Sequence, residues 1–250
     1  MKKIMILSFA LFCLVFIPTS VSAIESNEEE ATNFLTKDEV IKIDFAELDQ
    51  IRKKLDIKNK DNEYTEEEMN RFATQEIKST LTNKTREFIM TTMKTGYSYI
   101  PGFSDLTEKE VELARQHPVE FVTYASTAKN ASDETNKYFG KSQLWQGNGD
   151  AFRHTYWNAI LVPNFGGTMK GPNHGYNRAK VWTTAHEQNS KGADREMDLY
   201  NNEQGRQLGV TKYYNTNTQF SKSIRTMVKQ GSLVRIVKGQ LTATNGVTGK

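Results

Sequence analysis

The stretch GDAFRHTYWN, residues 149–158, indicates a helix with one polar face. Asp150, His154 and Asn158 are four residues apart, and side chains at that spacing lie on one side of an α-helix. Soluble helices normally turn an apolar face toward the core, and a polar group buried without a partner costs several kcal/mol. Asp150 also fits the N-cap of this helix, because Gly149 precedes it and apolar residues follow it. The stretch therefore predicts a helical fold with chemistry on an inward face.

Two further stretches have the same character. AHE at residues 185–187 lies on a predicted helix over residues 178–188 and sets a histidine beside a carboxylate. MDLYNNEQGR at residues 197–206 places acids and amides on one stripe of a predicted helix over residues 194–208. Gly205 lies within that stripe, where glycine costs about 1 kcal/mol relative to alanine. We therefore expect another element or a ligand to approach the helix closely at Gly205.

The candidate site residues all come from these three stretches. The candidates for acid–base catalysis are His154, His186, Glu187 and Asp150. The candidates for substrate binding are Arg153, Trp157, Asn158, Asn202 and Arg206. The candidate metal ligands are His154, His186 and Asp198.

This set of donors leaves three interpretations open. Imidazoles and carboxylates suit a divalent ion such as Zn²⁺, Mn²⁺ or Mg²⁺. A His–carboxylate pair also suits metal-free acid–base work. The spacing is not a standard zinc signature, since no His-Glu-x-x-His motif is present. A buried network of hydrogen bonds that only joins helices is the third interpretation.

The N-terminal residues predict export. Residues 1–23 combine a charged start, an apolar run and a small-residue cleavage site, which is typical of a secretory signal peptide. The one cysteine, Cys13, lies in this segment, so the predicted mature chain has no disulfide and no thiolate. Residues 24–68 carry 15 acids and 7 bases, whereas residues 69–250 carry 15 acids and 24 bases. A charge asymmetry of this size is typical of an interaction arm.

Periodicity predicts a mainly α fold with a single helical domain. Its predicted parts are a signal peptide at 1–23, an acidic arm at 24–62, a helical domain at 63–241 with the motifs at 106–209, and a flexible tail at 242–250. The segment 163–177, rich in Gly, Pro and Asn, is expected to be a loop. Residues 233–241 are expected to form one short strand.

The motifs resemble a bacterial domain family of unknown function that occurs in secreted proteins. They are also similar to C-terminal domains of polymorphic-toxin surface proteins. The resemblance covers about 100 of the 250 residues and rests on Leu106-Thr107, Glu110, His117-Pro118, residues 148–154, Trp157-Asn158, residues 185–187, residues 197–199, Asn201-Asn202 and Gly205-Arg206. It implies no settled activity.

The sequence favours a secreted bacterial hydrolase, with either a divalent metal or metal-free acid–base catalysis, acting on a phosphodiester or a lipid ester outside the cell. The arginines beside the histidines are the reason for an anionic or ester substrate. The alternative is a non-catalytic extracellular binding module in which the same side chains form a buried structural network. The sequence carries no strong signal for nucleic-acid binding, and we expect no transmembrane span after the signal peptide is removed.

Overall fold

The computed structural model describes residues 33–61, 63–90 and 106–249, except for the side chains of residues 85–90. The predicted signal peptide lies outside these residues. The described part is mainly helical, which confirms the predicted fold class, and none of its helices has the length and apolarity needed to cross a membrane. The elements are α1 (Lys37–Lys42), α2 (Phe45–Lys58), α3 (Glu66–Met90), α4 (Glu108–Gln116), α5 (Pro118–Tyr138), the 3₁₀ turn η1 (Lys141–Gln143), α6 (Asn148–Gly166), α7 (Gly171–His186), α8 (Gly192–Thr211), α9 (Asn217–Gln230), β1 (Val234–Val237) and β2 (Gln240–Ala243).

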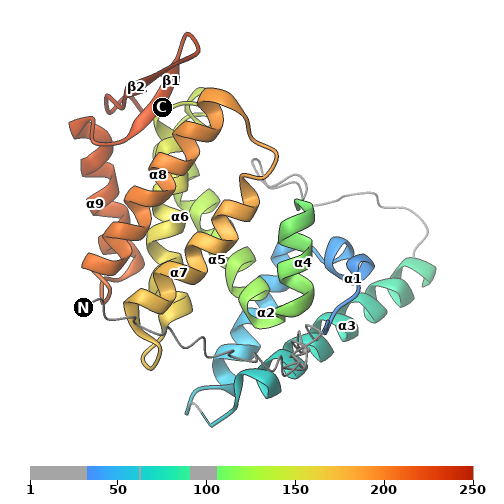
Figure 1. Ribbon diagram of the computed structural model, residues 1–250. Coiled ribbons are helices and arrows are strands. Elements are labelled where there is room, and N and C mark those ends of the chain that lie inside the picture. The colour runs from blue at the N-terminus through green and yellow to red at the C-terminus, as the bar shows by residue number, and fades with distance from the viewer. Residues whose placement is uncertain (1–32, 62, 91–105, 250) are drawn as a thin grey trace, which may run out of the picture. The chain divides into compact units, whose positions relative to one another are not determined.

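Helix α6 is the buried centre of the fold. Every residue from Asn148 to Val162 is buried, and the helix packs against α5, α7, α8 and α9 (Figure 1). The Tyr124 ring of α5 lies 4.8 Å from the Trp157 ring of α6 and 4.7 Å from the Trp182 ring of α7, measured between centroids. Aromatic pairs at this separation stabilise a core beyond their burial alone. The polar face of α6 is therefore held inside a rigid apolar frame.

Close packing of α8 on α6 depends on two glycines. A Cβ atom on Gly205 would lie 2.2 Å from the carbonyl oxygen of Thr155, and one on Gly209 would lie 2.8 Å from that of Ala159. These glycines are four residues apart and form a smooth stripe on α8. The close approach expected at Gly205 is thus present, and it brings the polar stripe of α8 against the polar face of α6.

The prediction of a loop at residues 163–177 is wrong. Helix α6 continues through Pro163, whose carbonyl accepts the N–H of Gly167 at 2.9 Å, and α7 begins at Gly171. Gly167 and Gly171 have φ of 54° and 77°, values that glycine adopts without strain. The Gly- and Pro-rich composition therefore marks the end of one helix and the start of the next, which is where these residues are favoured.

The helices from the predicted acidic arm pack on the rest of the protein through apolar side chains. Leu48, Ile51 and Leu55 of α2 are buried, and α2 lies against α5. The Asp49 carboxylate accepts the hydroxyl of Ser126 at 2.7 Å at the edge of this contact. Within residues 33–61, apolar burial therefore accounts for the docking, and charge contributes at the margin.

The C-terminal strand expected at residues 233–241 is two strands of a hairpin. β1 and β2 pair antiparallel, with Ile236 opposite Leu241. Lys238 and Gly239 form the turn with φ of 52° and 77°, and positive φ at both positions is typical of a type I′ hairpin turn.

The segment expected to be a flexible tail, residues 242–250, is anchored by hydrogen bonds at several positions, although most of its residues up to 249 are exposed. Asn148, at the start of α6, donates from Nδ2 to Oδ1 of Asn245 at 2.7 Å and to the carbonyl of Val247 at 2.8 Å. Thr244 is buried. The segment satisfies polar groups at the start of α6, and this long-range role leaves no local signal in the sequence.

Candidate metal centre

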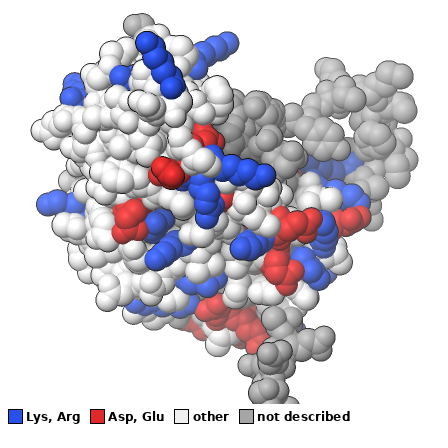
Figure 2. Space-filling view, turned by 45° about the horizontal axis from the view of Figure 1, so that its top comes forward, with Lys and Arg blue, Asp and Glu red and all other residues white. Residues whose placement is uncertain are grey.

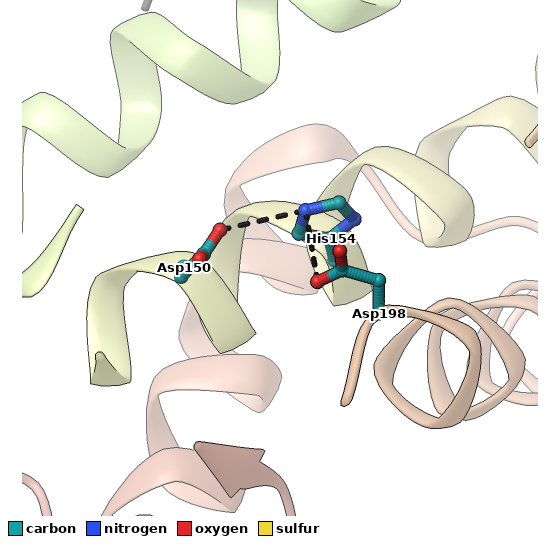
Figure 3. Close-up of side chains that lie close together, drawn as sticks. All are labelled: Asp150, His154 and Asp198. Carbon is teal, nitrogen blue, oxygen red and sulfur yellow. Dashed lines mark ion pairs between the residues drawn. The ribbon is translucent and has the colours of Figure 1, made fainter. Parts of the chain in front are cut away.

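Three side chains from two helices meet at one point. His154 Nε2 lies 3.4 Å from Asp150 Oδ1 and 3.3 Å from Asp198 Oδ1 (Figure 3). Asp150 and His154 are one turn apart on α6, as their spacing predicts, and Asp198 comes from α8. One donor atom from each side chain lies within 4.8 Å of the others, and all three residues are buried. We call these residues the Asp–His–Asp cluster.

Asp150 is not the N-cap of α6, because the helix begins two residues earlier and its N-cap is Gly147. Asp150 is the third residue of the helix, and its Oδ2 accepts the backbone N–H of Gln146 at 2.6 Å. Its Oδ1 accepts Nη2 of Arg153 at 2.6 Å. The carboxylate is therefore fixed from two sides, and its Oδ1 faces the imidazole.

A chain of hydrogen bonds fixes which nitrogen of His154 faces the carboxylates. Arg206 can only donate, and it donates to Oδ1 of Asn158 at 2.8 Å. The Nδ2 of Asn158 must then face Asn202, to whose Oδ1 it donates at 2.6 Å. The same oxygen lies 3.2 Å from Nδ1 of His154, so Nδ1 carries the hydrogen. When the ring is neutral, its lone pair is on Nε2 and points toward the two carboxylates.

Burial and neighbouring charges together raise the pKa of His154 and Asp198 and lower the pKa of Asp150. Burial disfavours protonated His154, but the carboxylates of Asp198 and Asp150 outweigh it and raise the pKa of His154 to about 9. Burial raises the pKa of Asp198 to about 7 despite the attraction of His154. For Asp150, burial is outweighed by Arg153 and His154, which lower its pKa.

Asp198 is the least satisfied member of the cluster. Its side chain is 8% exposed, and its Oδ1 is a buried atom without a hydrogen-bond partner. The contacts of His154 Nε2 at 3.3–3.4 Å are longer than charge-assisted hydrogen bonds, which are about 2.7–2.9 Å. Ligand atoms about 2.0–2.2 Å from a tetrahedral ion lie roughly 3.4 Å apart, which matches these contacts. These two contacts have the length of coordination-shell edges, and the three donor atoms together lie within 4.8 Å of one another.

His186 does not belong to this cluster, so its grouping with His154 and Asp198 as a metal ligand is wrong for the residues described. His186 Nδ1 lies 3.0 Å from Glu110 Oε1, and the same oxygen accepts a short hydrogen bond from the Tyr124 hydroxyl. Burial disfavours protonated His186, but Glu110 reverses this and raises its pKa. The physical reason is that His186 is the last residue of α7, where it faces α4.

Glu187 lies on the other side of the His154 ring from the cluster. Its Oε1 is 3.8 Å from His154 Nδ1, and its Oε2 accepts the hydroxyl of Ser190 at 2.8 Å. Asn202 Nδ2 donates to Glu187 Oε1 at 3.4 Å. The Glu187 carboxylate therefore lies near Nδ1 of His154, whereas Asp150 and Asp198 lie near its Nε2.

The predicted substrate-binding residues lie too deep to touch a substrate in this conformation. Trp157, Asn158 and Asn202 have no exposed surface, and Arg206 is 3% exposed. Trp157 packs in the aromatic core and donates to Thr127, so its surroundings are those of a core residue. The amides and Arg206 instead orient His154. Arg153, the fifth of the set, keeps a side chain that is 10% exposed.

Sequence reasoning missed the roles of Glu110, Tyr124 and Thr183. Glu110 is fully buried, although a capping-box acid is normally on the surface, and its only sequence signal was the box with Thr107. Thr183 donates to Asn158 Oδ1 at 3.0 Å and thereby reinforces the orientation of that amide. No spacing rule links these residues to their partners, because each partner is on another helix.

Fold and site together define a mainly helical domain built around a buried Asp–His–Asp cluster with an oriented imidazole. Residues 111–232 match a family model described as Domain of unknown function (DUF6973). The match contains the whole cluster and its orienting amides, and it begins one residue after Glu110. No curated protein and no solved structure matches the chain.

Proposed function

We propose that the Asp–His–Asp cluster binds one divalent metal ion and that the protein is a metal-dependent hydrolase. The observation that carries the proposal is the Oδ1 atom of Asp198, which is buried without a hydrogen-bond partner beside two other ligand-type atoms. The only partner of this oxygen among the described residues is the His154 ring at 3.3 Å, and a bound cation would supply a closer one.

Local charge also favours a divalent cation. With the carboxylates of Asp150, Glu187 and Asp198 ionised and Arg153 and His154 protonated, the balance is −3 + 2 = −1, and a metal ion that displaces the His154 proton would meet a balance of −3 + 1 = −2. A doubly charged ion cancels this balance in a buried setting, where uncompensated charge is most costly. Two carboxylates and one imidazole suit Zn²⁺ or Mn²⁺.

The number of ligands favours catalysis over a purely structural metal. Structural zinc sites are closed by four protein ligands, whereas catalytic sites have three and leave a position for water. The residues that would hold the ion are Asp150, His154 and Asp198, and an ion held there would activate a water molecule for ester hydrolysis. Arg153 and Asp198 keep the largest exposure around the cluster, with side chains 10% and 8% exposed, so a substrate would have to reach the ion past these two side chains.

The proposal is tested by metal content and hydrolysis in parallel. After exposure to Zn²⁺ or Mn²⁺ and desalting, the wild-type protein should retain about one ion per chain and cleave p-nitrophenyl acyl or phosphodiester probes. Asp198→Asn and His154→Ala should lose both properties. Glu196→Gln, an exposed neighbour on α8, is the control and should behave as the wild type. Retention of the ion by Asp198→Asn, or no retention by the wild type, would contradict the proposal.

The alternative, a non-catalytic module with a structural network, draws on one specific observation. Asn158 and Asn202 are fully buried and bonded between α6 and α8, which is typical of a polar connection that specifies helix packing. This alternative predicts that His154→Ala unfolds the protein at lower temperature while no metal binds to the wild type. The metal-site proposal predicts that the metal-free variant keeps its fold.

A further inference from the structure

The C-terminal part of the chain is uniformly basic. Glu203 is the last acidic residue, and residues 204–250 contain eight Lys or Arg and no Asp or Glu; of the eight, Arg206 is buried and Lys250 lies outside the described residues. This part forms the end of α8, all of α9 and the hairpin. In Figure 2, the top of the visible face carries Lys and Arg side chains without acidic ones. A surface with this composition attracts polyanions or anionic membranes.

The hairpin combines these charges with exposed apolar side chains. All of β2 is exposed, and Leu241 keeps 41% of its surface accessible. Arg235 lies on β1, and Lys238 is exposed at the hairpin turn. An exposed aliphatic side chain beside basic ones is better matched to a lipid surface than to a nucleic acid, which is bound through charge and stacking.

Trp145 extends the same surface. It is 72% exposed, and the next residue, Gln146, accepts the backbone N–H of Ile236 at 2.9 Å. Ile236 lies opposite Leu241 in the hairpin, so the residue after Trp145 is bonded to β1 on the edge away from β2. Tryptophan is enriched where proteins meet the interface of a bilayer. We call Trp145, Arg235, Lys238 and Leu241 the hairpin surface.

The hairpin surface borders the candidate metal centre through Gln146. The backbone N–H of Gln146 donates to Asp150 Oδ2 at 2.6 Å, and its side-chain Nε2 donates to Asp194 Oδ1 at 3.1 Å. Asp194 is one turn before Asp198 on α8. One residue thus connects the exposed surface to both helices of the cluster.

We propose that the hairpin surface docks on an anionic lipid bilayer and that the substrate of the adjacent site is an ester of a membrane lipid. The docking stands on the exposed residues Trp145, Lys238 and Leu241 with the half-exposed Arg235, whereas the lipid substrate rests on the function proposed above. Docking would bring the bilayer next to Gln146, which is bonded to both helices of the cluster.

The test is co-sedimentation with vesicles of phosphatidylcholine alone or with 30% phosphatidylserine. Each basic residue near an anionic surface strengthens binding about five-fold, so Arg235→Gln with Lys238→Gln should weaken binding to the anionic vesicles roughly 25-fold. The control, Lys42→Gln with Lys53→Gln on α1 and α2, removes the same charge and should bind as the wild type. All variants carry the same N-terminal residues, so those residues affect every measurement equally.

A second variant separates apolar insertion from charge. Trp145→Ser should weaken binding to anionic vesicles without changing the salt dependence, because no charge is lost. Equal binding by the hairpin variant and its control would overturn the proposal. So would binding to a short DNA duplex that competes fully with the vesicles, which would indicate a nucleic-acid surface instead.

Asp198→Asn separates the docking from the chemistry. This variant should bind anionic vesicles as the wild type does while releasing no lysolipid or fatty acid from them. Wild-type binding without any lipid hydrolysis would remove the lipid substrate and leave the docking surface intact. Loss of vesicle binding in Asp198→Asn would show that docking depends on the site and would contradict the independence of the two.

Discussion

Replacement of Asp198 by Asn should make the metal-free protein more stable than the wild type at pH 8, while it abolishes metal binding. The amide has nearly the same shape as the carboxylate and carries no charge. Burial raises the pKa of Asp198 from 3.8 to about 7, so the folded protein holds a proton that the unfolded chain releases. The wild type therefore loses stability as the pH rises from about 4 to about 7, and the Asn variant has no such loss.

The size of the effect follows from the interval between the two pKa values. Each pH unit within it costs about 1.36 kcal/mol, so the wild type loses roughly 3 kcal/mol between pH 5 and pH 7 and no more above pH 7. We therefore expect Asp198→Asn to gain up to about 3 kcal/mol on the wild type between pH 5 and pH 8, reduced by the loss of the attraction between Asp198 and protonated His154. Glu196→Gln, on the exposed side of α8, should show no such gain.

Urea unfolding in the presence of a chelator, at pH 5 and pH 8, measures this difference. The same titration with a divalent ion at 100 times its dissociation constant should stabilise the wild type by about 2.7 kcal/mol and leave Asp198→Asn unchanged. An Asn variant that is less stable than the wild type by the same amount at both pH values would refute the reasoning. That result would assign Asp198 to a structural hydrogen bond.

Three further outcomes are expected. Metal binding requires His154 to lose its proton, so the metal affinity measured by calorimetry should fall about tenfold per pH unit from pH 9 to pH 7. Below pH 7 the affinity should fall more steeply, because Asp198 is also protonated there. An affinity that does not depend on pH would contradict this expectation. Gly205→Ala should lower the free energy of unfolding by about 1–3 kcal/mol, because its Cβ has no room against α6; unchanged denaturation would show that the helices separate without cost. Glu110→Gln should lower the pKa of His186 in an NMR titration, since Glu110 holds that pKa above its usual value; an unchanged pKa would exclude Glu110 as the cause.

The contacts that could be predicted from the sequence lie within single helices. Asp150 and His154 face each other because they are four residues apart, and the 3.6-residue period is enough to foresee it. The helical periodicity of the sequence also identified the helix that carries Asp198, although it did not predict how close this helix lies to α6. Gly205 was a signal of close approach because glycine within a helix needs a reason.

The contacts that could not be predicted join distant segments. His186 and Glu110 are 76 residues apart, and no local pattern separates a histidine that faces α4 from one that faces the cluster. The segment 163–177 was wrongly predicted to be a loop for another reason. Gly and Pro interrupt helices, but they are also common where one helix ends and the next begins. The sequence therefore indicates which residues can act as ligands or acid–base groups, whereas the packing of the helices determines which of these residues are in contact.

The Asp–His–Asp cluster is difficult to explain as a purely structural feature. Full ionisation of Asp198 costs about 4 kcal/mol, which is the interval from 3.8 to about 7 expressed as free energy. A structural network that carries such a cost would be improved by an amide at this position, since Asn158 and Asn202 show that the fold accommodates buried amides. A cation present at roughly 1,000 times its dissociation constant stabilises the folded state by about 4 kcal/mol, which offsets the whole cost. The Asp198 carboxylate thus lowers the free energy of unfolding when no metal is bound, and a bound metal would compensate for this loss. That is the behaviour expected of a metal ligand.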